Sequence, residues 1–321
     1  MKNIPVLAIV LPCFNEEQIL PDTIKTLIAY LQGLKNKGLV SNNSFLLFVD
    51  DGSGDATWDL ISSQSQKNTV VNGLKLSRNV GHQCALLAGL KTADADIVVT
   101  IDADLQDDFS VIENMLDEYS KGAEIVYGVR NDRKSDGFFK RSTAELFYKF
   151  MRFLGVNIVF NHADFRLMSK KAIKTLDRYS EVNIFLRAII PLLGYKTAIV
   201  EYARFPRNAG ESKYPFLKML SFALTGVTSF SLKPLRIITA LGFFIAFLSA
   251  ITGVWAALAA LTGQADAPGW ASLLIVVSFL GGIQLFALGI VGEYVGRIYM
   301  ETKRRPLYEI EEKSGFYQSK E

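Results

Sequence analysis

Closely spaced carboxylates give the clearest chemical signal in the sequence. Residues 100–108 read TIDADLQDD and follow an apolar run at 97–101. Mg²⁺ and Mn²⁺ prefer oxygen ligands and share them with substrate phosphates. Asp102 and Asp104 could therefore hold one ion that neutralises charge on a departing diphosphate. The same pattern also occurs in solvated loops and helix caps, and Asp107 and Asp108 are predicted to cap a helix starting near Phe109.

A second acidic segment, residues 49–57, reads VDDGSGDAT and follows another apolar run. Asp50 and Asp51 could accept hydrogen bonds from a nucleobase or a ribose, and the glycines permit a tight turn. The alternative is a plain turn in which Asp55 caps the next helix. Neither a dinucleotide-binding glycine loop nor a phosphate-binding P-loop occurs in the chain. A third segment, PCFNEE at residues 12–17, could by itself be a helix start.

Apolar strands that alternate with helices are expected to position these groups. Strands are predicted at 6–11, 45–49, 73–76, 97–101 and 124–128, and helices at 19–34, from 57 onward and at 85–92. This alternation predicts an α/β fold with a mainly parallel sheet. In such sheets chemistry occurs at the carboxyl ends of the strands. The three polar segments fall there, as does Arg130.

Composition narrows the class of protein. Of 321 residues half are hydrophobic and the net charge is only +3, so no strong field indicates nucleic acid as a partner. The two cysteines are predicted to be reduced thiols. Two histidines cannot build a histidine-rich metal site.

The last part of the chain is strongly apolar. Between Arg236 and Glu293 the only charged residue is Asp266, and residues 237–261 and 270–292 are each long enough to span a bilayer. A hairpin of two transmembrane helices is predicted, with a turn at 262–269; the alternative is a buried helical subdomain of a soluble protein. Basic residues flank the hairpin at 233, 236, 297 and 303–305 and are missing from its turn, so both ends are expected in the cytoplasm.

Two further stretches mix aromatic and basic residues in a way that suits helices in the headgroup layer. They are residues 138–154 and 216–232. Ordinary packing of amphipathic helices on the sheet is the alternative for the first.

Together with SRNVGHQ at 77–83, the three polar segments closely resemble family 2 glycosyltransferases of the GT-A fold, over roughly residues 5–215. The hairpin narrows the resemblance to polyprenyl-phosphate glycosyltransferases, which include dolichyl-phosphate mannose synthases and undecaprenyl-phosphate glucosyltransferases of O-antigen modification. The loop RFPRNAGESKY at 204–214 is similar to the basic loop of that subgroup. Many relatives carry Lys after the glycine of the Asn-x-Gly part of the segment at 77–83, where this chain has His82-Gln83.

The resemblance implies a set of site residues. Nucleotide-sugar binding would involve Pro12, Phe14, Glu16, Asp50, Asp51, Asp102, Arg207 and Lys213. Asp102, Asp104 and Gln106 would hold Mg²⁺ or Mn²⁺, and Arg130 and Arg141 would meet phosphate, for which a guanidinium fork is suited.

The position often proposed as the base in such enzymes maps onto Asp164. Because a phosphate monoester is already anionic at neutral pH, the acceptor needs to be oriented toward the anomeric carbon more than it needs to be deprotonated. Asp164 could instead hold Arg166 or a sugar hydroxyl.

The implied function is transfer of a sugar, with inversion, from a nucleotide-sugar to a polyprenyl phosphate of the cell envelope. UDP-glucose and undecaprenyl phosphate are favoured; mannose from GDP-mannose or a modified sugar stays open. A processive polysaccharide synthase, a non-catalytic membrane scaffold and a soluble transferase are the rival hypotheses. The Gln-x-x-Arg-Trp segment of the first rival does not occur in the sequence.

The expected organisation is a catalytic domain at 1–215, an interfacial helix at 216–234, two spans within 235–294 and a cytoplasmic tail at 295–321. Such a protein would be a multi-pass protein of the inner (plasma) membrane, with its catalytic domain and both termini in the cytoplasm. Small residues at 281, 282 and 289 offer a packing surface for a homo-oligomer, which the sequence leaves open.

Overall fold

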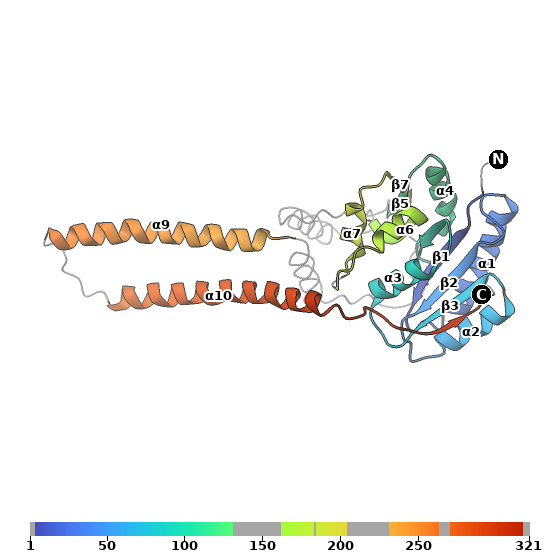
Figure 1. The fold of residues 1–321 in the computed structure, drawn as a ribbon, viewed down its shortest axis with the longest axis horizontal. Helices are drawn as coiled ribbons and strands as arrows, with labels where there is room; N and C mark the ends of the chain where they lie inside the picture. Colours follow the sequence, from blue (N-terminus) through green and yellow to red (C-terminus); the bar gives the residue numbers. More distant parts are fainter. Residues whose placement is uncertain (1–3, 131–161, 183, 204–230, 263–269, 317–321) are drawn as a thin grey trace. The chain divides into compact units, whose positions relative to one another are not determined.

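The computed structural model describes residues 4–130, 162–182, 184–203, 231–262 and 270–316 (Figure 1). The chain separates into two units. Residues 1–148, 158–213 and 304–321 belong to the first unit, and residues 149–157 and 214–303 belong to the second.

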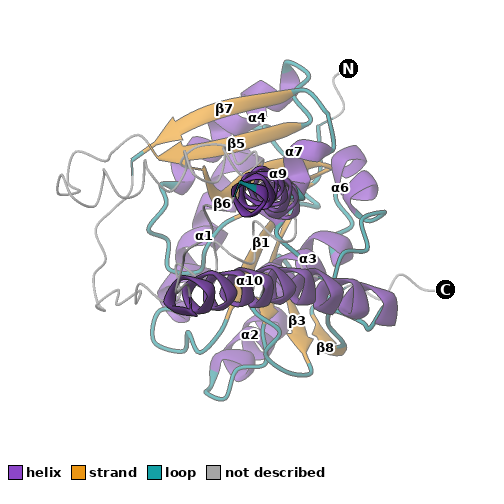
Figure 2. Ribbon diagram, turned by 90° about the vertical axis from the view of Figure 1, so that its left-hand side faces the viewer, coloured by secondary structure: helices purple, strands orange, loops and turns teal. Residues whose placement is uncertain are grey.

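An eight-stranded sheet forms the centre of the first unit, in the order β7-β5-β6-β4-β1-β2-β3-β8 (Figure 2). Parallel pairing joins β1 to β2 and β4, β2 to β3, and β5 to β7. Strand β6 is antiparallel to β4 and β5, and β8 is antiparallel to β3. The predicted mainly parallel α/β fold is therefore confirmed. The bounds are β1 (Leu7–Cys13), β2 (Phe45–Asp50), β3 (Val71–Leu76), β4 (Ile97–Thr100), β5 (Ile125–Arg130), β6 (His162–Ser169), β7 (Thr197–Tyr202) and β8 (Ile310–Ser314).

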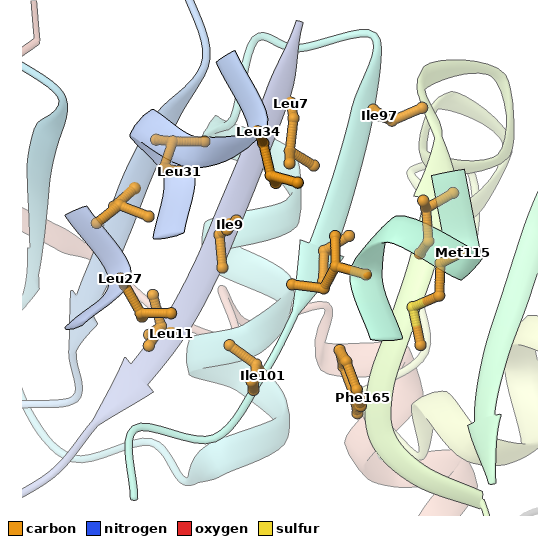
Figure 3. Packing of buried hydrophobic residues seen from close by; sticks show 14 of the residues in the cluster. Leu7, Ile9, Leu11, Leu27, Leu31, Leu34, Ile97, Ile101, Met115 and Phe165 are labelled. Atoms are coloured by element: carbon orange, nitrogen blue, oxygen red, sulfur yellow. The ribbon is translucent and has the colours of Figure 1, made fainter. Parts of the chain in front are cut away.

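Helices cover both faces of this sheet. Leu27, Leu31 and Leu34 of α1 (Leu20–Asn36) pack over the face of β1 that carries Leu7, Ile9 and Leu11 (Figure 3). The same core includes side chains of α2 (Thr57–Lys67) and α4 (Ile112–Ser120). Alternate strand residues point to opposite faces, and Val10 faces α3 (His82–Thr92). A Cβ on Gly89 of α3 would lie 2.4 Å from Val10 Cγ1, so α3 packs closely on the sheet. The described part of this unit also contains the short helices η1 (Phe109–Val111), α6 (Lys170–Leu176) and α7 (Leu186–Leu192).

The outer strand β8 comes from the end of the chain, where the sequence analysis predicted no strand. Its residue Glu312 accepts a hydrogen bond from Trp58 Nε1 of α2 at 3.1 Å. Its residue Ser314 lies 2.6 Å, hydroxyl to hydroxyl, from Ser65 of the same helix. The backbone N–H of Ser77, which follows β3, donates to the carbonyl of Glu309. The chain thus returns to the first unit after passing through the second.

The second unit contains the long helices α9 (Lys233–Leu261) and α10 (Trp270–Lys303). They are antiparallel, and the Tyr294 hydroxyl of α10 donates to the carbonyl of Ser231 just before α9. Both are long and apolar enough to cross a membrane, and their most apolar windows are 0% and 6% buried, unlike a core helix of a soluble protein. The predicted spans lie within these helices. The described residues include only residue 262 of the predicted turn. Of the two predicted interfacial stretches they include only residues 231 and 232.

Candidate active site

The carboxyl ends of β4, β1 and β2 meet at one edge of the sheet, because these strands are adjacent and parallel. Cys13 at the end of β1 pairs with Asp50 at the end of β2, and the N–H of Asp51 donates to the carbonyl of Cys13 at 2.8 Å. The three polar segments found in the sequence therefore come together, as predicted.

The loops after β1 and β2 are tied to each other through side chains. Asn15 accepts from the N–H of Gly54, and its own N–H donates to the Ser53 hydroxyl, both at 2.9 Å. Glu16 N donates to Thr57 Oγ1 at 2.8 Å. These hydrogen bonds hold the two loops together. Phe14, in the first of them, is 45% exposed, so its ring could stack on a nucleobase.

The paired aspartates after β2 are buried, unlike Phe14. Both oxygens of Asp51 accept backbone N–H bonds, from Val80 at 2.8 Å and Gly81 at 2.9 Å. Burial raises the pKa of Asp51, and these two bonds oppose the rise. Burial likewise raises the pKa of Asp50, whose Oδ2 has no hydrogen-bond partner among the described residues. Asp51 therefore holds the loop at 78–81 against the loop after β2.

Gly52 makes this close approach possible. Its φ is +66°, a conformation that L side chains rarely adopt, and a Cβ there would lie 2.5 Å from the carbonyl carbon of Arg78. Only glycine fits both the backbone conformation and the contact.

The segment after β4 forms a tight turn that carries the predicted metal ligands. The N–H of Leu105 donates to the carbonyl of Asp102 at 3.4 Å, and Leu105 has a φ of +46°. Positive φ is uncommon for a side-chain-bearing residue and often marks functional loops. Asp104 Oδ1 accepts from the N–H of Gln106, a nearly buried residue, at 3.2 Å. The Asp102 side chain is 39% exposed.

These residues fit a divalent cation that completes its shell with substrate oxygens. The pKa of Asp102 is raised, because the surrounding protein limits its contact with water and because Asp164, Asp107 and Asp104 add negative charge. His82 partly opposes this rise. In the described part of the chain no three His, Cys, Asp or Glu side chains form a chelating group by themselves. A bound Mg²⁺ or Mn²⁺ would therefore share its coordination with phosphate oxygens, as is usual for Mg²⁺.

Asp107 and Asp108 have separate roles. Asp108 accepts from the N–H of Ser110 at 3.0 Å and caps η1, as predicted. The prediction for Asp107 was wrong, because this buried carboxylate pairs with Arg130 at 3.2 Å. Arg130 Nε also donates to the Tyr202 hydroxyl at 3.1 Å. The turn after β4 and the arginine at the end of β5 are thus linked.

Asp164 lies beside the end of β4 because β6 pairs with β4 in antiparallel register. The Thr100 hydroxyl donates to the Asp164 carbonyl. The Asp164 carboxylate pairs with the wholly buried Arg166 and, at 3.0 Å, with Arg187 of α7. Gln83 Nε2 donates to it at 3.2 Å.

Charge explains the protonation state of this carboxylate. Burial would raise the pKa of Asp164, but bonding to His82 and the charges of Arg166 and Arg187 hold it well below the ordinary value. His82 Nε2 lies 3.5 Å from Asp164 and 3.7 Å from Asp102. Although burial lowers the pKa of His82, Asp164 and Asp102 raise it above the usual value. Of the alternatives left open for Asp164, the pairing with Arg166 is present in the structure.

The structure also places the other predicted residues. Pro12 is buried in β1, opposite Val49, and Glu16 is half-buried in the loop after it. Arg141, Arg207 and Lys213 lie outside the described residues. Sequence reasoning missed Arg187 and Tyr202, which no motif marks, and drew no role from Gln83.

The chain belongs to glycosyl transferase family 2, whose family model matches residues 8–177, and is therefore a glycosyltransferase. A second model, described as the GtrB C-terminal hairpin, matches residues 233–298. The loop residues described above and the apolar hairpin thus lie within two recognised family segments.

Three relatives resemble nearly the whole chain. A protein of Bacillus subtilis (strain 168), the uncharacterized glycosyltransferase YkoT, is 54% identical over 96% of this chain and 91% of its own length. The bactoprenol glucosyl transferase of Shigella phage SfV is 40% identical over 94% of this chain and 97% of its own. The prophage bactoprenol glucosyl transferase homolog of Escherichia coli (strain K12) is also 40% identical over the same shares.

Proposed function

We propose that this enzyme transfers glucose from UDP-glucose to undecaprenyl phosphate at the cytoplasmic face of the plasma membrane. The observation that carries the proposal is the 40% identity to bactoprenol glucosyl transferases across both the catalytic domain and the hairpin. A lipid acceptor fits a chain that joins a nucleotide-sugar domain to two helices long enough to span a bilayer.

The proposed reaction is a single displacement. An oxygen of the lipid phosphate attacks the anomeric carbon while the bond from that carbon to the diphosphate oxygen breaks, and UDP leaves with the bonding electrons. The configuration inverts, so an α-linked donor gives a β-linked product. The acceptor is already anionic at neutral pH, so the protein need only position the reactants.

The chain's own residues divide the positioning between them. Phe14, exposed beside the Asp51 loop, is proposed to stack on the uracil, with the half-buried Glu16 at the pocket wall. Pro12 and Asp50, buried at the ends of β1 and β2, are proposed to support this pocket.

On the phosphate side, Asp102, Asp104 and Gln106 would hold Mg²⁺ or Mn²⁺, which stabilises charge on the leaving diphosphate when bound. Arg130, fixed by Asp107 and Tyr202, is proposed to bind a substrate phosphate. Arg141, Arg207 and Lys213 are proposed to contribute further phosphate contacts.

Chain topology supports the proposed membrane orientation. Strands β1 to β7 precede the hairpin and β8 follows it, yet all belong to one sheet. If α9 and α10 both cross the bilayer, the start of α9 at Lys233 and the end of α10 at Lys303 must lie on the same side of the membrane as the catalytic domain. Basic residues at those ends favour a cytoplasmic location for that side by the positive-inside rule.

The test is an assay of the full chain in detergent with Mg²⁺ or Mn²⁺, undecaprenyl phosphate and a panel of nucleotide-sugars. We expect UDP release and a lipid-phosphate-hexose, identified by mass, from UDP-glucose alone. A product from GDP-mannose instead would overturn the donor assignment. Donor hydrolysis without a lipid product would overturn the acceptor assignment.

A further inference from the structure

Asp164 occupies the position at which the family resemblance suggests a base, yet its surroundings differ from those of a proton acceptor. Its side chain is only 7% exposed, and two guanidinium groups bond to its oxygens. Arg187 bonds twice, through Nε at 3.3 Å and through a terminal nitrogen at 3.0 Å. A carboxylate already surrounded by donors has little capacity to receive a proton from a substrate.

Gln83 bonds both to Asp164 and to the backbone beside Arg187. Its amide nitrogen donates to Asp164, and its amide oxygen accepts from the backbone N–H of Leu186 at 3.2 Å. Leu186 is the first residue of α7 and immediately precedes Arg187. The start of α7 is therefore positioned against the same carboxylate that bonds its arginine.

The two arginines differ in exposure. Arg166 is wholly buried, so its charge serves to balance Asp164. The Arg187 side chain is 35% exposed and reaches Asp164 from α7. His82, 3.5 Å from Asp164, lies 3.7 Å from Asp102 of the metal-binding turn. Arg187 thus brings a partly exposed cation to Asp164, and His82 connects Asp164 to the turn where the donor diphosphate is expected to bind.

We propose that Asp164 is a positioning residue that anchors Arg187 at the substrate edge, where the guanidinium of Arg187 binds a phosphate group. This inference rests on the proposed function, which supplies phosphates in both the nucleotide-sugar and the lipid acceptor. Arginine suits the task because its planar fork is held on one side by the carboxylate while remaining partly open to solvent.

The experiment compares Arg187→Gln, Arg187→Lys, Asp164→Asn and the double variant Asp164→Asn/Arg187→Gln in the full chain. KM for UDP-glucose, KM for undecaprenyl phosphate and kcat are measured together with Mn²⁺-dependent binding of UDP by calorimetry. Arg178→Gln is the matched control, because this exposed arginine follows α6 outside the site.

We expect Arg187→Gln to raise one KM by about tenfold or more, the usual loss for a charge-assisted hydrogen bond. A rise for UDP-glucose with weaker UDP binding assigns the donor phosphate, and a rise for the lipid assigns the acceptor phosphate. Asp164→Asn should raise the same KM, and the double variant should fall within about threefold of the worse single variant, because coupled residues are not additive. Arg187→Lys should recover part of the loss.

Two results would overturn the inference while leaving the proposed function intact. One is wild-type turnover with both KM values and UDP binding unchanged in Arg187→Gln. The other is an Asp164→Asn variant that loses kcat alone, together with the acid limb of the pH–rate profile, as removal of a general base would cause. Wild-type protein that binds UDP but forms no lipid product would count against the proposed acceptor. In that case, the comparison of UDP binding between wild type and Arg187→Gln would still decide whether Arg187 contacts the donor phosphate.

Discussion

Replacement of Asp164 by alanine should destabilise the protein, because it leaves a buried guanidinium without its counter-ion. Arg166 is fully buried, and Asp164 is the only acidic side chain paired with it in the described residues. Removing one member of such a pair costs about 3–5 kcal/mol. A ΔΔG of that size lowers the Tm of a domain of this length by about 6–20 °C.

The assay is thermal unfolding of the full chain in detergent, followed by circular dichroism. Asp94→Asn is the control, since Asp94 pairs with Lys170 at an exposed position where such pairs are worth about 1 kcal/mol or less. The double variant Asp164→Asn/Arg166→Met should recover much of the loss, because a neutral pair carries no unbalanced charge. An unchanged or higher Tm for Asp164→Ala would refute the reasoning, and would be typical of a strained catalytic group whose removal relaxes the fold.

The dependence of this effect on pH follows from the direction of the pKa shift. The folded-state pKa of Asp164 is depressed, so its contribution is fully present above the unfolded value near 4 and is lost as pH falls through the folded value. The Tm difference between wild type and Asp164→Asn should therefore shrink in acid. It should also be larger at about pH 6 than at about pH 8, because Asp164 raises the pKa of His82 and that contribution is lost as His82 deprotonates. A difference that persists undiminished into acid would contradict the assignment.

Three further predictions concern other parts of the molecule. Asp104→Asn should lower turnover by about a hundredfold or more with an unchanged Tm, since it removes charge from the proposed metal site, and near-normal activity would contradict that site. Gly52→Ala should lower the Tm and weaken UDP binding, because the new Cβ would lie 2.5 Å from the Arg78 backbone and a left-handed alanine costs about 1–2 kcal/mol. Unchanged unfolding and binding would count against the described turn. Deleting residues 306–321 should lower the Tm and speed proteolysis of the catalytic domain by uncovering β3, whereas a fully stable, active truncation would contradict the role of β8.

Much of the fold could be read from local sequence. The strands β1, β2 and β4 are almost continuous apolar runs, because both faces of a parallel sheet are buried, and this pattern is visible without coordinates. The polar segments after those strands had to share one edge of the sheet once the parallel arrangement was recognised. The hairpin helices were evident from length and hydropathy alone.

Strand β8 was not predictable in this way. Its five residues, Ile310–Ser314, include Glu311, Glu312 and Lys313 and lie at an exposed outer edge, so they lack both an apolar run and a clear alternation. Its identity as a strand depends on pairing with β3, which precedes it by more than two hundred residues in the sequence. Only the tertiary structure brings those backbones together.

The sequence by itself determined the inventory of candidate groups: carboxylates for a cation, an aromatic ring for the nucleoside and arginines for phosphate. It did not determine which of these groups bond to one another, since it predicted a helix cap at Asp107 and left Asp164 as a base or as a partner of Arg166 or of a sugar hydroxyl. The antiparallel insertion of β6 beside β4 brings Asp164 next to Thr100, within reach of Arg187 and His82. Pairing between groups distant in sequence depends on three-dimensional register and burial, which no local pattern encodes.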